Sequence, residues 1–352
     1  MPKVAAVATA LPPHRIDQTA ARAFVTTHFR NGRPDIDRLA GVFDHAGTAT
    51  RYICVPPAWF LEPRTFKEKN DLYIDWATRL GARVARDCCT AAGIPLTDID
   101  QVIFVSTTGL ATPSIDARLV NVLGLRPDIR RTPIWGLGCA GGAGGLAHAY
   151  QATRNNPSVR VLLIAVELCS LTFQPDDHSK SNIVATALFA DGAAGVLVVG
   201  DDVACPASCP AIADAHSTTW PDSLDVMGWN FQSEGMQVVF SRAIPALVRD
   251  KAHDNITAFL KRSNLGFGDI AALAVHPGGT KVLQAYEETL ELPSACFNHA
   301  RAVLRDYGNM SSPTVLFVLK RLLETGPPPT GAHALMTALG PGFSAENLLL
   351  QF

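Results

Sequence analysis

The sequence predicts an α/β protein, in which strands and helices alternate and helices cover both faces of the sheets. Several short apolar runs end at turn residues, as buried strands do, and the longer segments between them repeat their apolar residues with a helical period. Apolar residues make up 47% of the 352 positions, which is enough to fill one large core or two domains. Strands of this kind need helices on both sides to exclude water.

The expected strands are continuous apolar runs, which is typical of strands buried on both faces. We expect them at residues 101–107, 159–168, 193–200, 271–276 and 332–339. Helical periodicity predicts helices over residues 72–93 and 243–264. The opening residues, MPKVAAVATALPPHR, could be taken for a signal peptide. However, Lys3 is the only charge before the apolar run and two prolines follow at once, so a buried first strand is the better interpretation.

The bulk composition excludes some function classes. A formal net charge of -2, with no basic run interleaved with aromatic residues, argues against nucleic-acid binding. No stretch approaches the ~18 uncharged apolar residues that span a bilayer. Charged residues are only 18% of the chain, whereas about 25% is usual, so we expect a homo-oligomer whose partner covers part of the surface. The eight scattered cysteines indicate reduced thiols and a cytoplasmic protein.

Two parts of the chain resemble each other. Residues 98–109 align with residues 268–279, and at the same offset Cys139 falls on Asn309. The identities are few, so a chance likeness between two α/β units is one explanation. The other is an internal duplication whose strand-to-helix turns face each other, which would bring positions 139, 276 and 309 together.

The stretch WGLGCAGGAGGL, residues 135–146, places Cys139 among six glycines just before a helical segment. A thiol at a helix N-terminus meets the positive end of the helix dipole, which stabilises a thiolate, and nearby N–H groups can hold an acyl oxygen. The glycines would also suit a phosphate loop, but the Gly-Lys-Ser/Thr ending is missing. A structural cysteine in a tightly packed helix is the other alternative.

His276 and Asn309 are candidate partners of that thiol. His276 ends an apolar strand and is followed by PGG, which leaves its imidazole at the strand tip. A core or surface role is usual for a lone histidine, but at this tip the ring could pair with a thiolate and hydrogen-bond a thioester carbonyl. Asn309 opens NMSSPTVLF, where a helix-capping role is the alternative. Its amide could polarise a thioester carbonyl while a malonyl group loses carbon dioxide.

The motifs GCAGG, HPGG, GNMSS and ALGPGF, in this order and spacing, resemble the type III polyketide synthases, the chalcone synthase-like branch of the thiolase superfamily. The resemblance covers the chain from about residue 3 to its last residue. It implies a five-layered αβαβα thiolase fold made of two duplicated halves: residues 1–212 with Cys139, and residues 213–352 with His276 and Asn309. It also implies a cytoplasmic homodimer that uses CoA thioesters and needs no metal, cofactor or acyl carrier protein.

The resemblance implies a role for each motif residue. Cys139 would accept the acyl group, while His276 and Asn309 would activate malonyl-CoA and stabilise the enolate. Phe189 matches a phenylalanine that shields the cysteine, and Arg51 resembles a basic residue at the CoA entrance. Further residues are expected to contact the substrate, one of them by reaching into the partner's cavity: Cys169, Thr172, Ser311 and, for the partner, Thr112.

Two departures from plant chalcone synthases bear on the product. Val238 stands where those enzymes have a second gating phenylalanine, and Trp229 stands where a cavity wall has glycine. A smaller gate would admit a bulkier acyl group, whereas the tryptophan would remove volume elsewhere. Both substitutions resemble bacterial members that make alkylpyrones, alkylresorcinols or small aromatic polyketides.

The resemblance thus predicts an acyltransferase that loads a starter from acyl-CoA onto Cys139 and extends it by repeated decarboxylative Claisen condensation with malonyl-CoA. The product would then cyclise to a pyrone, a resorcinol or a related aromatic polyketide. One alternative is an initiating ketoacyl carrier-protein synthase, which shares the Cys, His and Asn residues but condenses once. The other is a catalytically silent binding protein with the thiolase fold, against which the intact Cys139, His276 and Asn309 argue.

Overall fold

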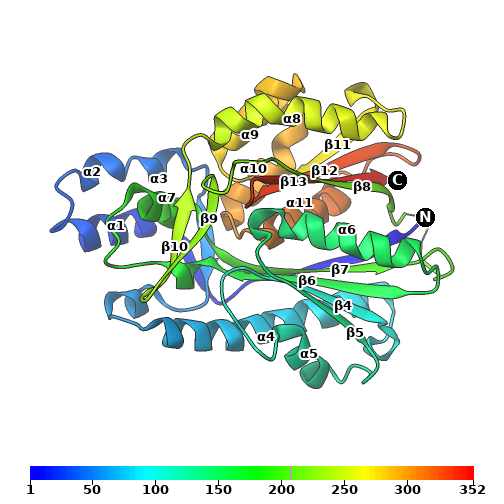
Figure 1. The fold of residues 1–352 in the computed structure, drawn as a ribbon, viewed down its shortest axis with the longest axis horizontal. Helices are drawn as coiled ribbons and strands as arrows, with labels where there is room; N and C mark the ends of the chain where they lie inside the picture. The colour runs from blue at the N-terminus through cyan, green and yellow to red at the C-terminus, as the bar shows by residue number, and fades with distance from the viewer. Residues whose placement is uncertain (207) are drawn as a thin grey trace.

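The computed structural model describes residues 1–206 and 208–352, and one nine-stranded sheet crosses the molecule (Figure 1). Its strand order is β11-β12-β13-β8-β1-β7-β6-β4-β5. The strands are β1 (Lys3–Ala10), β4 (Gln101–Val105), β5 (Arg130–Ile134), β6 (Arg160–Leu168), β7 (Asp191–Val199), β8 (Ala211–Thr219), β11 (Ile270–Val275), β12 (His333–Gly340) and β13 (Ser344–Gln351). Two antiparallel pairs lie outside it: β2 (His14–Asp17) with β3 (Thr50–Ile53), and the hairpin of β9 (Met227–Gln232) with β10 (Gly235–Phe240).

The two parts of the large sheet repeat one pattern of pairing. β4 lies parallel to β6, and β6, β7 and β1 then follow as antiparallel neighbours. In the same way β11 lies parallel to β12, and β12, β13 and β8 follow as antiparallel neighbours. The two parts meet where Lys3 of β1 pairs with Ala211 of β8, so the expected boundary between residues 212 and 213 falls inside β8. The repeated pattern is what a duplication produces.

The helices complete five layers, which follow one another from top to bottom in Figure 1. α6 (Gly141–Arg154) and α11 (Ser312–Thr325) form the middle layer, because each contacts strands of both sheet halves. α4 (Phe66–Ala92) and α5 (Ile115–Leu123) cover one outer face, and α8 (Ile244–Lys261) and α9 (Thr280–Leu290) lie beyond the opposite half. α10 (Asn298–Tyr307) packs against α11. The expected αβαβα architecture is therefore present.

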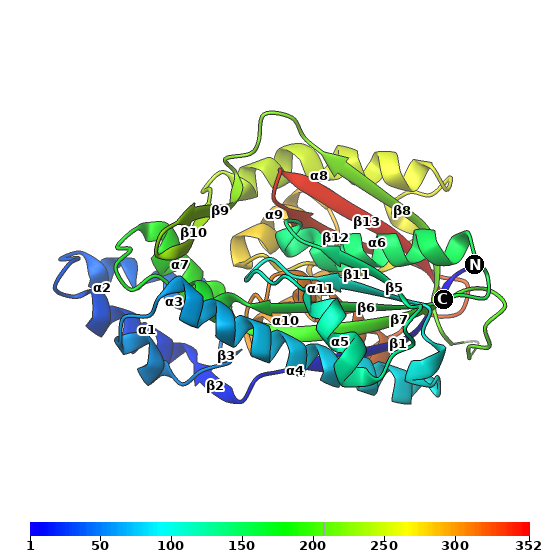
Figure 2. The ribbon, with the colours of Figure 1, turned by 60° about the horizontal axis from the view of Figure 1, so that its bottom comes forward.

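Four shorter helices gather at one end of the sheet in both views (Figure 2). They are α1 (Gln18–Phe29), α2 (Ile36–Leu39), α3 (Val42–His45) and α7 (Lys180–Leu188). Their apolar faces form a separate small core with Phe29, Phe43 and Leu188 among its members. In the described part of the chain, no helix is long and apolar enough to cross a membrane.

The predicted strands and helices are present, with shifted ends. α4 begins at Phe66, well before the expected start at residue 72, because Thr65 and Glu68 form a capping box ahead of the apolar periodicity. α8 ends at Lys261 instead of residue 264. Both differences lie in polar terminal turns, where the apolar pattern carries no signal.

The glycine-rich stretch makes the turn into the central helix α6. Gly138 has φ of 48°, a left-handed conformation that favours glycine, and it opens a short 3-10 turn over Gly138–Ala140. A Cβ atom on Gly142 would lie 2.2 Å from the carbonyl oxygen of Ser312, so only glycine allows α6 to approach α11 this closely. The stretch is therefore a packed turn and helix.

Candidate active site

The structure brings Cys139 and Asn309 together, beside the end of the strand that leads into His276. Cys139 lies in the 3-10 turn before α6, and its thiol accepts stabilising hydrogen bonds from the side chains of Ser311 and Asn309 that lower its pKa. Asn309 Nδ2 lies 3.4 Å from the carbonyl oxygen of Gly278, two residues after His276. The alignment of positions 139 and 309 in the sequence thus corresponds to contact in the fold.

The surroundings of Cys139 raise the pKa of its thiol. Burial raises the pKa of the Cys139 thiol to about 11, and the nearby Glu167 carboxylate contributes in the same direction. The hydrogen bonds from Ser311 and Asn309 offset only part of this effect. The expected helix-terminal activation is therefore outweighed by desolvation, and the thiol is protonated at neutral pH.

His276 follows β11 directly, and its main-chain N–H donates to Thr337 O at 2.9 Å. The imidazole is buried, and neither ring nitrogen has a hydrogen-bond partner in the described structure. Burial lowers the pKa of His276 to about 3, so the ring is neutral at pH 7. Burial disfavours the charged form of both groups, and the thiolate–imidazolium ion pair expected from the sequence stays a prediction.

Asn309 is held by its main chain on both sides. Its N–H donates to Leu188 O at 2.9 Å, and its carbonyl accepts from Ala190 N–H at 2.9 Å. The side-chain Oδ1 accepts from Ser311 N–H at 2.8 Å. Ser311, not Asn309, is the N-cap residue of α11, so the buried Asn309 amide is turned toward Gly278 and the thiol instead of capping the helix.

Sequence reasoning missed Glu167, which lies fully buried near the end of β6. Its carboxylate accepts from Thr107 N–H at 2.9 Å, from the Thr107 and Thr108 hydroxyls at 2.8 Å each, and from the Ser312 hydroxyl at 2.9 Å. Burial raises the pKa of this carboxyl. The available signal was an acidic residue inside the apolar run of residues 159–168.

An apolar cavity of about 150 Å³ lies next to these residues. Five residues that the resemblance singled out line it: Arg51, Phe189, Val238, Cys169 and Thr172. The Cys139 thiol is close enough to Cys169 to raise the pKa of that buried thiol, so the two sulfurs are neighbours across the cavity wall. The face of α1 that carries Ala20, Ala21 and Phe24 forms the opposite wall.

Trp229 and Thr112 lie outside that cavity. Trp229 pairs directly with Val238 across β9 and β10, so both side chains share one face of the hairpin while only Val238 lines the cavity. Thr112 is exposed in the loop before α5. Ser311, by contrast, is buried and contacts the Cys139 thiol.

The structure places Arg51 inside the fold, away from the surface where a CoA entrance was expected. The Arg51 side chain is only 4% exposed and points inward from β3, on the same face as Ile53. Its guanidinium donates to main-chain carbonyls at the end of α7, among them Ala187 O at 2.7 Å. These contacts leave no guanidinium face at the surface for a phosphate.

A second cavity, of about 600 Å³, is lined by several basic side chains, and Arg51 is not one of them. It borders Gly278 and Gly279, beside His276, and Phe240, whose ring meets Phe189 edge-on at a centroid distance of 6.3 Å. Its basic side chains are His45, Lys180, Arg242 and Lys281. They come from four separate segments of the chain, so no local sequence motif predicts that they lie together.

Comparisons with known proteins agree on one family. The model for "Chalcone and stilbene synthases, N-terminal domain" matches residues 2–202, and that for the C-terminal domain matches residues 211–352. A Bacillus subtilis protein is 42% identical over 99% of this chain and 98% of its own length. A 1,3,6,8-tetrahydroxynaphthalene synthase of Streptomyces peucetius is 37% identical over 99% of this chain and 93% of its own.

A solved structure agrees with them. The 1,3,6,8-tetrahydroxynaphthalene synthase of Streptomyces coelicolor A3(2), described as a bacterial type III polyketide synthase, superposes with a TM-score of 0.94 at 27% identity and covers 99% of both chains. The thiolase-like fold and the acyltransferase class follow, and neither the ketoacyl carrier-protein synthase nor the silent binding protein is favoured. The chain belongs to the chalcone and stilbene synthase family of type III polyketide synthases.

Proposed function

We propose that Cys139 carries the growing acyl chain, and that His276 and Asn309 activate malonyl-CoA for condensation. The observation that carries this proposal is the contact of Asn309 and Ser311 with the Cys139 thiol, behind an apolar cavity large enough for part of an acyl chain. The neutral His276 ring, whose two nitrogens have no partner in the described structure, is free to meet a substrate.

Loading begins with a protonated thiol. As the Cys139 sulfur attacks the starter thioester carbonyl, its proton passes to the neutral His276 ring and then to the CoA sulfur, which leaves as free CoA. Burial lowers the pKa of His276 to about 3 and makes the ring a weak base, so this transfer accompanies sulfur attack instead of preceding it. Burial of the acylated sulfur protects the thioester from water.

Extension needs an enolate. The C–C bond between the malonyl carboxylate and its methylene breaks, carbon dioxide leaves, and the charge moves to the thioester oxygen. The Asn309 amide and one His276 N–H stabilise that oxygen as neutral donors that do not protonate the carbanion. The enolate carbon then attacks the Cys139 thioester, the C–S bond breaks, and the longer chain, now on CoA, returns to Cys139 for the next cycle.

The cationic cavity is proposed as the CoA site. Lys180, Arg242 and Lys281 supply positive charge for the CoA phosphates, and the cavity passes Gly278 and Phe240 toward His276. The apolar cavity with Val238 as its gate would take the starter and the growing chain. A pyrone, a resorcinol or a related aromatic polyketide then results from cyclisation, with no metal, cofactor or acyl carrier protein.

We also propose a homodimer that pairs through the surface around Thr112. Three large apolar side chains are exposed near it: Leu110 at 41%, Trp135 at 47% and Phe231 at 50%. Trp135 and Phe231 are in ring contact at 5.8 Å, and β5 is the free edge of the sheet beside them. An apolar patch and an open strand edge both favour burial against a second copy.

The test is mass spectrometry of products from malonyl-CoA and a panel of acyl-CoA starters. We expect masses of one starter acyl group plus whole C2H2O units, less the water or carbon dioxide that ring closure expels. Cys139→Ala should abolish condensation yet retain malonyl-CoA decarboxylation, whereas Asn309→Ala should lose decarboxylation. Cys296→Ala, which removes a partly buried thiol outside both cavities, is the matched control and should leave the products unchanged. Condensation by Cys139→Ala, or normal decarboxylation by Asn309→Ala, would contradict the proposal.

A further inference from the structure

Arg51 is a buried cation in an unusual setting. Nη1 donates to Thr186 O and, at 3.1 Å, to Phe189 O, while Nη2 donates to Gln18 Oε1 and, at 2.7 Å, to Ala187 O. Burial lowers the pKa of Arg51 to about 10, so the group stays charged at neutral pH, and no carboxylate contributes to that pKa. All four N–H groups on Nη1 and Nη2 thus donate hydrogen bonds, three to main-chain carbonyls of residues 186–189 and one to Gln18.

The carbonyls of α7 take the place of a carboxylate. Thr186 and Ala187 lie in the last turn of this helix, which ends at Leu188. Carbonyls at a helix C-terminus carry partial negative charge and have no partner within the helix, so a cation there is favourable. A planar guanidinium meets several of them in a fixed fork of N–H groups, a geometry that the compact ammonium of lysine does not provide. The cost of burying the charge is therefore offset only while this turn keeps its shape.

The same turn holds Asn309. Leu188 O accepts from Asn309 N–H at 2.9 Å, and Ala190 N–H donates to Asn309 O at 2.9 Å. These two hydrogen bonds flank Phe189, whose carbonyl is bound by Arg51 and whose side chain lines the apolar cavity. Arg51 and Asn309 therefore hold adjacent atoms of one short segment, from opposite sides.

We propose that Arg51 is a positioning residue for malonyl-CoA decarboxylation, which fixes residues 186–190 and through them the direction of the Asn309 amide. The inference rests on the proposed role of Asn309. It predicts a selective defect, because loading a starter onto Cys139 does not require the enolate to be stabilised. A displacement of the amide by about 1 Å can cost on the order of a hundredfold in rate.

The experiment compares two reactions in Arg51→Lys. This variant keeps the charge and removes the fork. We expect Cys139 loading from acyl-CoA, followed by intact mass, to stay near the wild-type rate, and the KM for malonyl-CoA to change little. The kcat for malonyl-CoA decarboxylation should fall about tenfold or more. The matched control is Arg15→Lys, on the paired strand β2, where the side chain is exposed; it should change neither reaction.

A second variant covers the case in which Arg51→Lys does not fold. Gln18→Ala leaves Arg51 in place and removes one of its acceptors, together with the Gln18 bond to Ala187 O at 3.1 Å. It should give the same selective loss of decarboxylation, by a smaller factor.

The proposal on Arg51 is overturned if folded variants decarboxylate at the wild-type rate, or if loading and decarboxylation fall together. Failure of the proposed function would look different. In that case the wild-type enzyme would not decarboxylate malonyl-CoA, or Asn309→Ala would do so normally, whatever the Arg51 variants did.

Discussion

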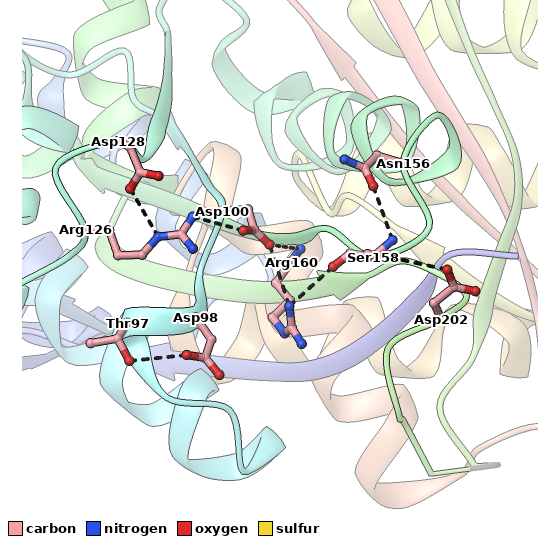
Figure 3. Close-up of polar contacts among 9 residues, drawn as sticks. All are labelled: Thr97, Asp98, Asp100, Arg126, Asp128, Asn156, Ser158, Arg160 and Asp202. Carbon is pink, nitrogen blue, oxygen red and sulfur yellow. Dashed lines mark hydrogen bonds and ion pairs between the residues drawn. The ribbon is translucent and has the colours of Figure 1, made fainter.

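The two ends of β6 each hold a carboxylate, but with opposite kinds of partner. At its first residue, Arg160 N–H donates to Asp100 at 2.8 Å, and Arg126 pairs with the same carboxylate at 3.0 Å (Figure 3). That side chain is 24% exposed. Near the other end of β6, Glu167 is 0% exposed, and hydroxyl groups and one main-chain N–H surround it.

The difference shows what each end of the sheet must do. Arginine side chains and solvent screen the charge of Asp100. This cluster therefore links neighbouring strands and exerts little electrostatic field on its surroundings. Neutral donors satisfy the hydrogen bonds of Glu167 without cancelling its charge, and the remaining field raises the pKa of Cys139. The end of β6 that carries Glu167 thus favours a protonated Cys139 thiol. A cation in place of those hydroxyls would reverse this preference.

The largest effect that separates the two ends is on stability. Glu167→Ala would leave the main-chain N–H of Thr107 and the hydroxyls of Thr107, Thr108 and Ser312 without their acceptor in a buried site. We expect the free energy of unfolding in urea to fall by about 3 kcal/mol or more. Asp100→Ala, in the partly exposed cluster, should lower it by about 1 kcal/mol. Equal losses in the two variants, measured at one protein concentration, would remove the distinction.

A second and smaller effect is on the thiol itself. With a Cys139 pKa of about 11, the rate of alkylation by iodoacetamide should rise about tenfold for each pH unit from 7 to 10, because only the thiolate reacts. Glu167→Gln removes the neighbouring negative charge, so the pKa should fall and alkylation at pH 8 should become faster. The labelled residue is identified by peptide mass spectrometry.

Asp100→Asn is the control, because it removes the same charge at the other end of β6. Its alkylation profile should match that of the wild type. If the wild-type rate is already level at pH 7, Cys139 of the free enzyme is a thiolate, which contradicts a pKa raised by burial.

The sequence predicted those parts of the molecule in which a local pattern carries the information. Continuous apolar runs located the main strands of the sheet, and the likeness of residues 98–109 to residues 268–279 corresponds to the two parallel pairs, β4–β6 and β11–β12. Cys139 and Asn309 could be found because each stands where small residues lead into a buried helix.

Other features depend on segments that only the fold brings together. The partners of Glu167 come from residues 106–108 and from the start of α11, and no spacing in the sequence links them. Arg51 resembled a surface cation by motif, whereas the alternation of β3 turns it inward beside Ile53. Desolvation also depends on tertiary packing, and no local pattern in the sequence shows that burial raises the pKa of Cys139 to about 11.

The smallest predicted change concerns the charge of His276, which should not alter at all across the pH range in which histidines usually titrate. Because burial lowers its pKa to about 3, the ring should stay neutral from pH 8 down to pH 5. NMR of ring-labelled protein can follow this, with His276→Asn to assign the resonance and the urea-unfolded chain as the reference that titrates near 6.5. A folded-state titration near 6.5 would mean that the ring is hydrated or paired with a negative charge. The thiolate–imidazolium pair would then be the resting state of the site, and burial with the negative field of Glu167 would not suffice to keep Cys139 protonated.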